Sequence, residues 1–333
     1  MRKKYLDWLR ALAIMGVMLV HVVAEKLNGY AGDFSWQWLA NPVWGGVGRG
    51  CVVIFVLISG ATLLGKKEEN WKKFLTKRWL RLLLIYILWQ IVYYWRQKHE
   101  LPSIQHLITQ ESTYHLWYMR MILGVYLLVP PLRLLLAKLD EKKLKIILGG
   151  WTMTVVMAGM IAPDVGQHGA PLSRIFSYGV LLLWGYYLSK LPERKNGWLG
   201  IGGWLAAMII MTAGLISSWT AEGWFDERWH NNLSPLVLGG GIGLFYGLSQ
   251  MEKKLPKLKM VEVLSKASFG IYLVHLIPWE NLKKISYFDG TWPNDWLGVP
   301  LAGGMVLIIS WIVVVVYQQI STRVLTLLKK VVG

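Results

Sequence analysis

The sequence predicts an all-α integral membrane protein, a bundle of about ten transmembrane helices with both termini in the cytoplasm. The first observation is composition, because 54% of the 333 residues are hydrophobic, whereas soluble domains contain about 45–50%. The second is a series of long apolar segments, most of them of the size that crosses a bilayer. They lie near residues 5–24, 43–64, 79–95, 116–136, 145–162, 173–189, 197–218, 233–250, 267–279 and 297–320.

The third observation is the distribution of charge. The chain carries a net charge of +17, with 36 Lys and Arg against 19 Asp and Glu. If the N-terminus is cytoplasmic, most basic residues fall in short cytoplasmic loops, which agrees with the positive-inside rule. The basic excess then reflects topology and contact with anionic membrane lipids, and no nucleic-acid partner is expected. The single cysteine, Cys51, excludes an internal disulfide and a cysteine-based metal cluster, and no metal site is expected.

The first apolar segment, 5–24, contains two polar side chains that suggest chemistry. Arg10 and His21 are eleven residues apart, so in a helix they share one face, about 16 Å apart along its axis. Ionisable groups in membrane helices usually face the bundle interior or a cavity. An imidazole can take a proton from a hydroxyl, and Arg10 could hold an anionic group or pair with Asp7. The alternative is an interfacial histidine with an arginine that reaches the membrane surface.

Basic residues precede the third segment, 79–95. Arg78 and Arg81 are one turn apart and follow Lys77, so these side chains can bind one polyanion, such as the phosphates of a nucleotide-like acyl carrier. Ordinary positive-inside charge is the alternative interpretation. In the preceding segment, 43–64, the pair Ser59-Gly60 predicts a close approach between helices.

The fourth segment, 116–136, opens with the aromatic and basic residues His115, Trp117, Tyr118 and Arg120. An arginine at that depth needs a partner, so structural ion pairing and a role in a substrate pocket are both open for Arg120.

The ninth segment, 267–279, again places polar groups in an apolar run. Ser268, Tyr272 and His275 are spaced by four and three, so they form one stripe on a helix. Hydrogen bonds between packed helices explain such residues well. For His275 a structural and a functional role are both open.

These blocks together resemble the transmembrane acyltransferase family 3, the bacterial membrane O-acyltransferases. The resemblance covers nearly the whole chain, which is expected to be a single transmembrane domain, 1–333. Its strongest parts are Tyr5 to Arg10 with His21, Val53 to Gly60, Lys77 to Arg81, Tyr114 to Tyr118 and Ser268 to His275. The length and the Tyr-His-Leu-Trp block are also similar to the enterobacterial members that O-acetylate an amino sugar of the common antigen.

The resemblance implies transfer of an acyl group, commonly acetyl from acetyl-CoA as co-substrate, to a hydroxyl of an envelope glycan or lipid-linked sugar. The implied location is the bacterial inner membrane, and no permanently bound cofactor is implied. The resemblance also gives His21 a catalytic role and Arg10 an essential one, and it places Arg78 and Arg81 in contact with CoA.

A working mechanism follows from these positions. His21 acts as general base or transient acyl acceptor, and Arg10, Arg120 or Tyr118 orients the substrates or opposes developing charge. The candidate substrate pocket contains His115, Trp117, Tyr118, Arg120, Tyr272 and His275. The main alternative is a transporter or exporter of a glycan or small solute, against which the sequence shows no evident inverted repeat. A non-catalytic membrane sensor is a third possibility.

Overall fold

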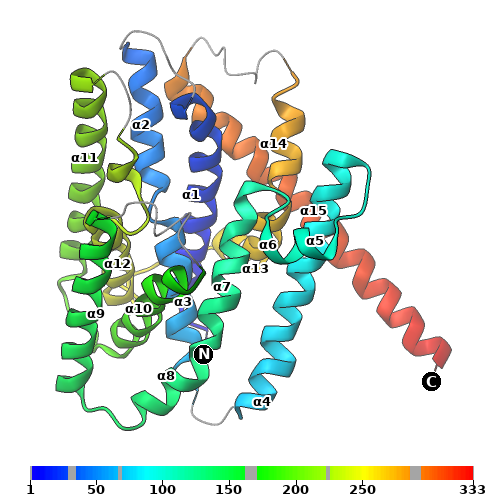
Figure 1. Cartoon of the computed structure of the whole chain (residues 1–333), viewed down its shortest axis with the longest axis horizontal. Coiled ribbons are helices and arrows are strands. Elements are labelled where there is room, and N and C mark those ends of the chain that lie inside the picture. Colours follow the sequence, from blue (N-terminus) through cyan, green and yellow to red (C-terminus); the bar gives the residue numbers. More distant parts are fainter. Residues whose placement is uncertain are drawn as a thin grey trace. The chain divides into compact units, whose positions relative to one another are not determined.

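The computed structural model describes residues 2–28, 35–66, 70–161, 171–222, 226–285 and 294–332. Every regular element in these ranges is a helix (Figure 1), which confirms the all-α prediction. The described part of the chain contains no strand. Helices suit a membrane protein because they satisfy their own backbone hydrogen bonds.

Within these ranges, six helices or runs of helices are long and apolar enough to cross a membrane. They are α1 (Lys4–Asn28), α2 with α3 (Trp36–Gly48 and Cys51–Leu63), η2 with α7 and α8 (Tyr114–Leu116, Trp117–Leu127 and Val129–Leu136), α9 (Glu141–Ile161), α11 (Gly197–Glu222) and α15 (Asp295–Val332). The pair α13 (Lys259–Val274) and α14 (Leu276–Leu282) adds a seventh if it is one broken span, because these helices are bent by 64°. The chain is thus a multi-pass membrane protein.

The other three predicted crossings also form helices, namely α5 (Leu80–Lys98), α10 (Pro171–Lys190) and α12 (Pro235–Gln250). They are not among the helices that are long and apolar enough to span. Helix α12 has only 16 residues, and polar side chains such as Arg81 and Gln90 interrupt α5. The count of ten crossings is therefore not confirmed, and the cytoplasmic location of both termini stays a prediction.

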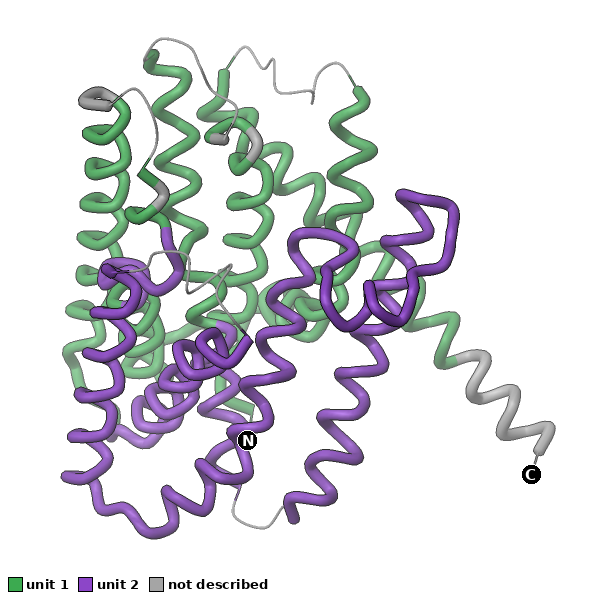
Figure 2. Tube along the Cα trace, in the orientation of Figure 1, with its two compact units in different colours: residues 1–54, 193–230, 239–333 green, residues 55–192, 231–238 purple. Residues whose placement is uncertain are grey.

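The chain divides into two compact units (Figure 2). Unit 1 comprises residues 1–54, 193–230 and 239–333 and contains α1, α2, α11, the 3₁₀ helix η4 (Glu227–His230), α13, α14 and α15. Unit 2 comprises residues 55–192 and 231–238 and contains α4 (Trp71–Phe74), the π-helical segment η1 (Leu75–Trp79), α5, α6 (Ile104–Thr109), η2 and α7 to α10. Helices α3 and α12 each begin in one unit and continue in the other.

In unit 1, helix α1 packs against α2, α13 and α15. Helices α1 and α2 cross closely at two glycines, because a Cβ at Gly48 would lie 2.5 Å from the Gly16 carbonyl oxygen and 2.7 Å from Val20 Cγ2. A side chain at position 48 would therefore separate the two helices. The crossing places Arg49, the next residue, beside the stretch of α1 that leads to His21.

The N-terminal end of α1 is held by the segment that follows α12. No Ser, Thr, Asp or Asn precedes Lys4 to cap the helix. Instead, the Glu252 carboxylate accepts hydrogen bonds from the backbone N–H groups of Lys4 and Tyr5, at 2.9 and 2.7 Å. The Trp8 indole N–H donates to the Pro256 carbonyl at 3.1 Å. Because an acidic group at a helix N-terminus also interacts favourably with the helix dipole, these contacts fix the start of α1.

In unit 2, helices α3 and α10 cross at equally short range. A Cβ at Gly60 would overlap the backbone of Leu182, and a Cβ at Gly185 would overlap that of Leu57. The close helix approach predicted at Ser59-Gly60 is therefore confirmed. Ser59 Oγ also lies 3.0 Å from the Tyr126 hydroxyl, which links α3 to α7.

Candidate active site

Arg10 lies in a polar network in the N-terminal part of α1. Its Nη1 is 3.6 Å from Asp7 Oδ1, so the ion pair that the i, i+3 spacing allows is formed. Asp7 also accepts hydrogen bonds from the Arg2 guanidinium at 2.7–2.9 Å and from Ser265 Oγ at 2.6 Å. Because Ser265 belongs to α13 and Asp7 is only 8% exposed, the network ties α1 to α13.

His21 lies about three turns further along α1, beside the second predicted histidine. The ring centroids of His21 and His275 are 4.9 Å apart, with the ring planes inclined by 32°. His275 is fully buried, whereas His21 is half-buried. His21 is therefore the more exposed residue of this pair.

His275 has a defined tautomer because it lies at the bend between α13 and α14. Its Nδ1 is 2.7 Å from the Tyr272 carbonyl oxygen, and since a carbonyl only accepts, Nδ1 carries a hydrogen. In the neutral ring Nε2 is then the basic nitrogen. The buried Tyr272 ring lies 6.0 Å from the His275 ring. The fold thus brings His275 to His21, and Tyr272 lies beside His275.

Arg49 supplies a positive charge that acts on His21. No pattern in the sequence identifies this residue as part of the site. Arg49 ends α2 with helical dihedral angles (φ −60°, ψ −32°). It interacts electrostatically with His21, with His230 and with Cys51. Its place next to α1 follows from the close crossing at Gly48.

His230 of η4 is a further buried imidazole in unit 1. It is 4% exposed, and it lies against α2, because a Cβ at Gly45 would be 3.6 Å from His230 Cε1. Burial, followed by the positive charge of Arg49, lowers the pKa of His230 well below its ordinary value, so the ring is neutral at pH 7. Within the described part of the chain, its Nε2 has no hydrogen-bond partner.

This arrangement suits proton transfer and charge stabilisation. Among the described residues, no group of three or more His, Cys, Asp and Glu side chains is placed to hold a metal ion. A half-buried imidazole can take a proton from a hydroxyl, and a nearby guanidinium can stabilise negative charge on an oxygen. The attack of a hydroxyl on a carbonyl carbon requires both functions.

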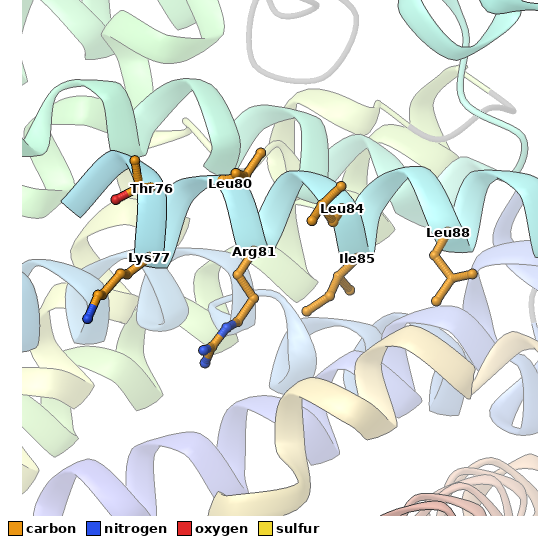
Figure 3. Close-up of a pocket in the computed structure, with 7 residues that line it drawn as sticks. All are labelled: Thr76, Lys77, Leu80, Arg81, Leu84, Ile85 and Leu88. Atoms are coloured by element: carbon orange, nitrogen blue, oxygen red, sulfur yellow. The ribbon is translucent and has the colours of Figure 1, made fainter. Parts of the chain in front are cut away.

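Unit 2 carries a groove along η1 and α5, with two of the three predicted CoA-binding residues, Lys77 and Arg81, at one end (Figure 3). Its volume is about 560 Å³, and it is lined by Thr76, Lys77, Leu80, Arg81, Leu84, Ile85 and Leu88. Lys77 and Arg81 extend from the same side of the helix (Figure 3), and both are exposed. Positive charge at one end is therefore followed by a run of apolar side chains.

The basic residues lie at the junction of the π-helical segment η1 with α5. A π-helical turn contains more residues than an α-helical turn, and such turns are frequent at functional sites. Spacing alone pairs Arg78 with Arg81, whereas the groove is lined by Lys77 and Arg81; Arg78 is half-buried and does not line it. The Trp79 indole N–H donates to the Leu123 carbonyl at 2.9 Å, which anchors η1 to α7.

Arg120 has several structural partners within unit 2. Its Nη1 lies 3.1 Å from Glu111 Oε1, and its Nε donates to the Tyr86 hydroxyl at 3.1 Å. Its two Nη groups donate to the carbonyls of Thr109 and Gln110. The ion pairing expected of a membrane arginine is therefore present, and it fixes the segment between α6 and η2.

The other candidates at the start of α7 make aromatic packing contacts in unit 2. His115 is 1% exposed. Trp117 packs against Tyr178, with ring centroids 6.0 Å apart, and Tyr118 packs against Phe55 at 6.4 Å. A role of these residues in substrate binding stays a prediction.

Two candidate site residues of unit 1, Arg49 and His230, are not predicted from the sequence. For Arg49 a signal exists, because it is the single charged residue between positions 43 and 64, and charges inside membrane segments often mark functional sites. For His230 there is none, since no spacing in the sequence relates it to α2.

A comparison with protein families matches residues 3–315 to the model of an acyltransferase domain, that of the acyltransferase 3 family. The match covers nearly the whole chain and both compact units. Neither the comparison with curated proteins nor that with solved structures gave a match. The subfamily that acetylates an amino sugar therefore stays a prediction.

Proposed function

Because the chain belongs to the acyltransferase 3 family, we propose that it is a membrane O-acyltransferase. The proposed reaction moves a short acyl group, in the first place acetyl from acetyl-CoA, to a hydroxyl of an envelope glycan or lipid-linked sugar. The proposed location is the bacterial inner membrane, where the cytoplasm supplies the acyl-CoA. The observation that carries the proposal is the pair formed by half-buried His21 and buried His275.

In the proposed reaction His21 is the general base. It takes the proton of the acceptor hydroxyl while the hydroxyl oxygen bonds to the carbonyl carbon of the thioester. The carbon–sulfur bond then breaks, its electron pair leaves on sulfur, and the sulfur recovers the proton from His21. The products are the ester and free CoA thiol. A route through an acyl group carried on His21 uses the same imidazole.

His275 and Tyr272 support this role of His21. The hydrogen bond from His275 Nδ1 to the Tyr272 carbonyl fixes the orientation of the His275 ring. At a separation of 4.9 Å, repulsion between two positive rings disfavours their simultaneous protonation. His21 therefore holds the proton of the acceptor alone until the sulfur recovers it.

Donor binding is assigned to the groove of unit 2. The guanidinium of Arg81 and the ammonium of Lys77 suit the phosphates of CoA, and Arg78 adds positive charge to the same segment. The apolar lining from Leu84 to Leu88 suits the slender pantetheine arm. Trp117, Tyr118 and His115 of unit 2 are proposed to contact the acceptor, and for Arg120, which has structural partners, the same role is decided by the test given in the Discussion.

The proposal is tested by His21→Gln in the full-length protein, with acetyl-CoA labelled in the acetyl group and an envelope glycan fraction as acceptor. We expect transfer to fall by at least about 10²-fold, the usual contribution of a general base. His99→Gln, at the exposed end of α5, is the matched control and should transfer at the wild-type rate. Undiminished transfer by a folded His21→Gln protein would refute the assignment, and solute movement by a wild-type protein that transfers no acyl group would favour the transporter.

The groove is tested separately by equilibrium binding of acetyl-CoA. Arg81→Gln and Lys77→Gln should each weaken binding by about 3–10-fold, because each removes one charge-assisted contact to phosphate. Lys98→Gln removes a cation from the same helix outside the groove and should bind normally. Unchanged affinity in both groove variants would remove the donor role from this surface.

A further inference from the structure

Unit 1 contains a second arginine of interest, Arg49, which ends α2, whereas Arg10 lies in α1. Arg10 is eleven residues from His21 on one helix, which corresponds to about 16 Å along the axis, and its guanidinium lies near the Asp7 carboxylate. Arg49 instead acts electrostatically on His21 itself and on His230. Helix α2 therefore also brings a positive charge to His21.

We propose that Arg49 and His230 form the subsite that holds the carbonyl oxygen of the acyl thioester during transfer, an inference that rests on the proposed function. When the acceptor oxygen attacks, the carbonyl π electrons move onto this oxygen, which becomes negatively charged. Arg49 stabilises that charge, and His230 donates a hydrogen bond from Nε2. The charge returns to the carbonyl when the carbon–sulfur bond breaks.

The geometry of α2 supports this pairing. Gly45 and Arg49 are one turn apart, and Arg49 keeps helical dihedral angles, so both lie on one face of α2. The His230 ring lies against Gly45, where an added Cβ would be 3.6 Å from Cε1. Glycine at position 45 therefore admits the imidazole to the helix face that carries the guanidinium.

The state of His230 points to a ligand. Its Nε2 is buried, and the described residues supply it with no hydrogen-bond partner. Leaving such a group unsatisfied is destabilising, and buried polar atoms in native proteins are nearly always satisfied. A carbonyl oxygen at this position would satisfy it during the reaction. Because the ring is neutral, it can donate a hydrogen bond without adding a second charge beside Arg49.

The electrostatic environment is also complementary to a developing anion. Arg49 acts on both imidazoles, and the buried surroundings make its charge more effective than it is in water. Donors of this kind typically contribute about 10²–10³-fold to kcat, because they bind the transition state more strongly than the substrate.

The test uses Arg49→Lys, Arg49→Gln and His230→Gln in the full-length protein, with kcat and KM measured for acetyl-CoA and for the glycan acceptor. We expect Arg49→Gln to lower kcat by about 10²-fold or more, and Arg49→Lys and His230→Gln by about 10-fold. KM for both substrates and equilibrium binding of acetyl-CoA should stay within about 3-fold, because the interaction forms in the transition state. Lys266→Gln and His99→Gln, both exposed, are matched controls expected at the wild-type rate.

The outcomes separate this inference from the proposed function. Wild-type kcat in folded Arg49→Gln and His230→Gln, with an inactive His21→Gln, overturns the subsite and leaves the acyltransferase intact. A change confined to KM or to acetyl-CoA binding also overturns it. Absence of acyl transfer by the wild-type protein defeats the proposed function, and the subsite with it. If Arg49→Gln does not fold, Arg49→Lys and His230→Gln decide the matter, since both keep the volume of the side chain they replace.

Discussion

Arg10 in helix α1 and Arg49 at the end of α2 differ in the chemistry of their neighbours. Arg10 lies beside the Asp7 carboxylate, which also binds Arg2 and Ser265. Arg49 interacts electrostatically with the imidazoles of His21 and His230. The Arg10 network ties α1 to α13, whereas Arg49 is proposed to stabilise charge during the reaction. The difference shows that an arginine's neighbours, and not its residue type alone, indicate what it can do.

Among variants that test this comparison through the packing of the helices, the largest effect is expected from disturbing the crossing that positions Arg49. Gly48→Ala adds a Cβ that would overlap the Gly16 carbonyl and Val20, so α1 and α2 must separate. We expect transfer to fall by more than about 10-fold and the free energy of unfolding to fall by about 1–3 kcal/mol. Activity assays and thermal unfolding in detergent measure both.

The matched control for this variant is Gly202→Ala in α11. A Cβ there would meet no atom of the described residues within 4 Å, and alanine is a better helix former than glycine by about 1 kcal/mol. Equal behaviour of the two variants would show that the Gly16–Gly48 contact does not position the site.

The next effect is expected at the Arg10 network. Asp7→Asn removes the carboxylate that Arg2 and Arg10 share, so the free energy of unfolding should fall by about 1–3 kcal/mol. Adding Arg10→Gln to Asp7→Asn should cost less than Arg10→Gln alone, because the partner is already lost. Additive losses in this double-mutant cycle would show that the ion pair does not stabilise the fold.

A smaller and more local effect is expected at Arg120. Arg120→Gln removes the contacts to Glu111, Tyr86 and the carbonyls of residues 109 and 110. Amide hydrogen exchange across residues 109–113 should rise, with exchange in unit 1 helices unchanged. Lys98→Gln serves as the control on neighbouring α5. Loss of acyl transfer without any change in exchange would move Arg120 from the structural group to the pocket.

Much of the fold follows from the sequence because apolar segments of membrane length have few structural solutions. All ten segments form helices, and Ser59-Gly60 lies at a close crossing as expected. The sequence does not predict where two of these helices are broken. The segment 43–64 is interrupted at Arg49 and Gly50, and the segment 267–279 bends by 64°. Such breaks depend on tertiary packing, which periodicity does not report.

The candidate site was predictable only where its residues share a helix or a known pattern. Arg10 with His21, and Tyr272 with His275, are visible as stripes on single helices. Arg49 and His230 come from α2 and η4, and only the Gly16–Gly48 crossing and the space at Gly45 relate them to α1. The groove shows the same limit, because regular helical spacing allows both Arg78 and Lys77 to pair with Arg81, and only the structure shows that Lys77 and Arg81 line it.

The most direct test of the account is a double-mutant cycle between His21 and Arg49, with kcat for acetyl transfer as the measured quantity. His21→Gln, Arg49→Lys and the double variant are compared in the full-length protein. If both side chains act in the same step, the double variant transfers about as slowly as His21→Gln alone. Effects that multiply independently in the double variant would contradict a shared reaction centre.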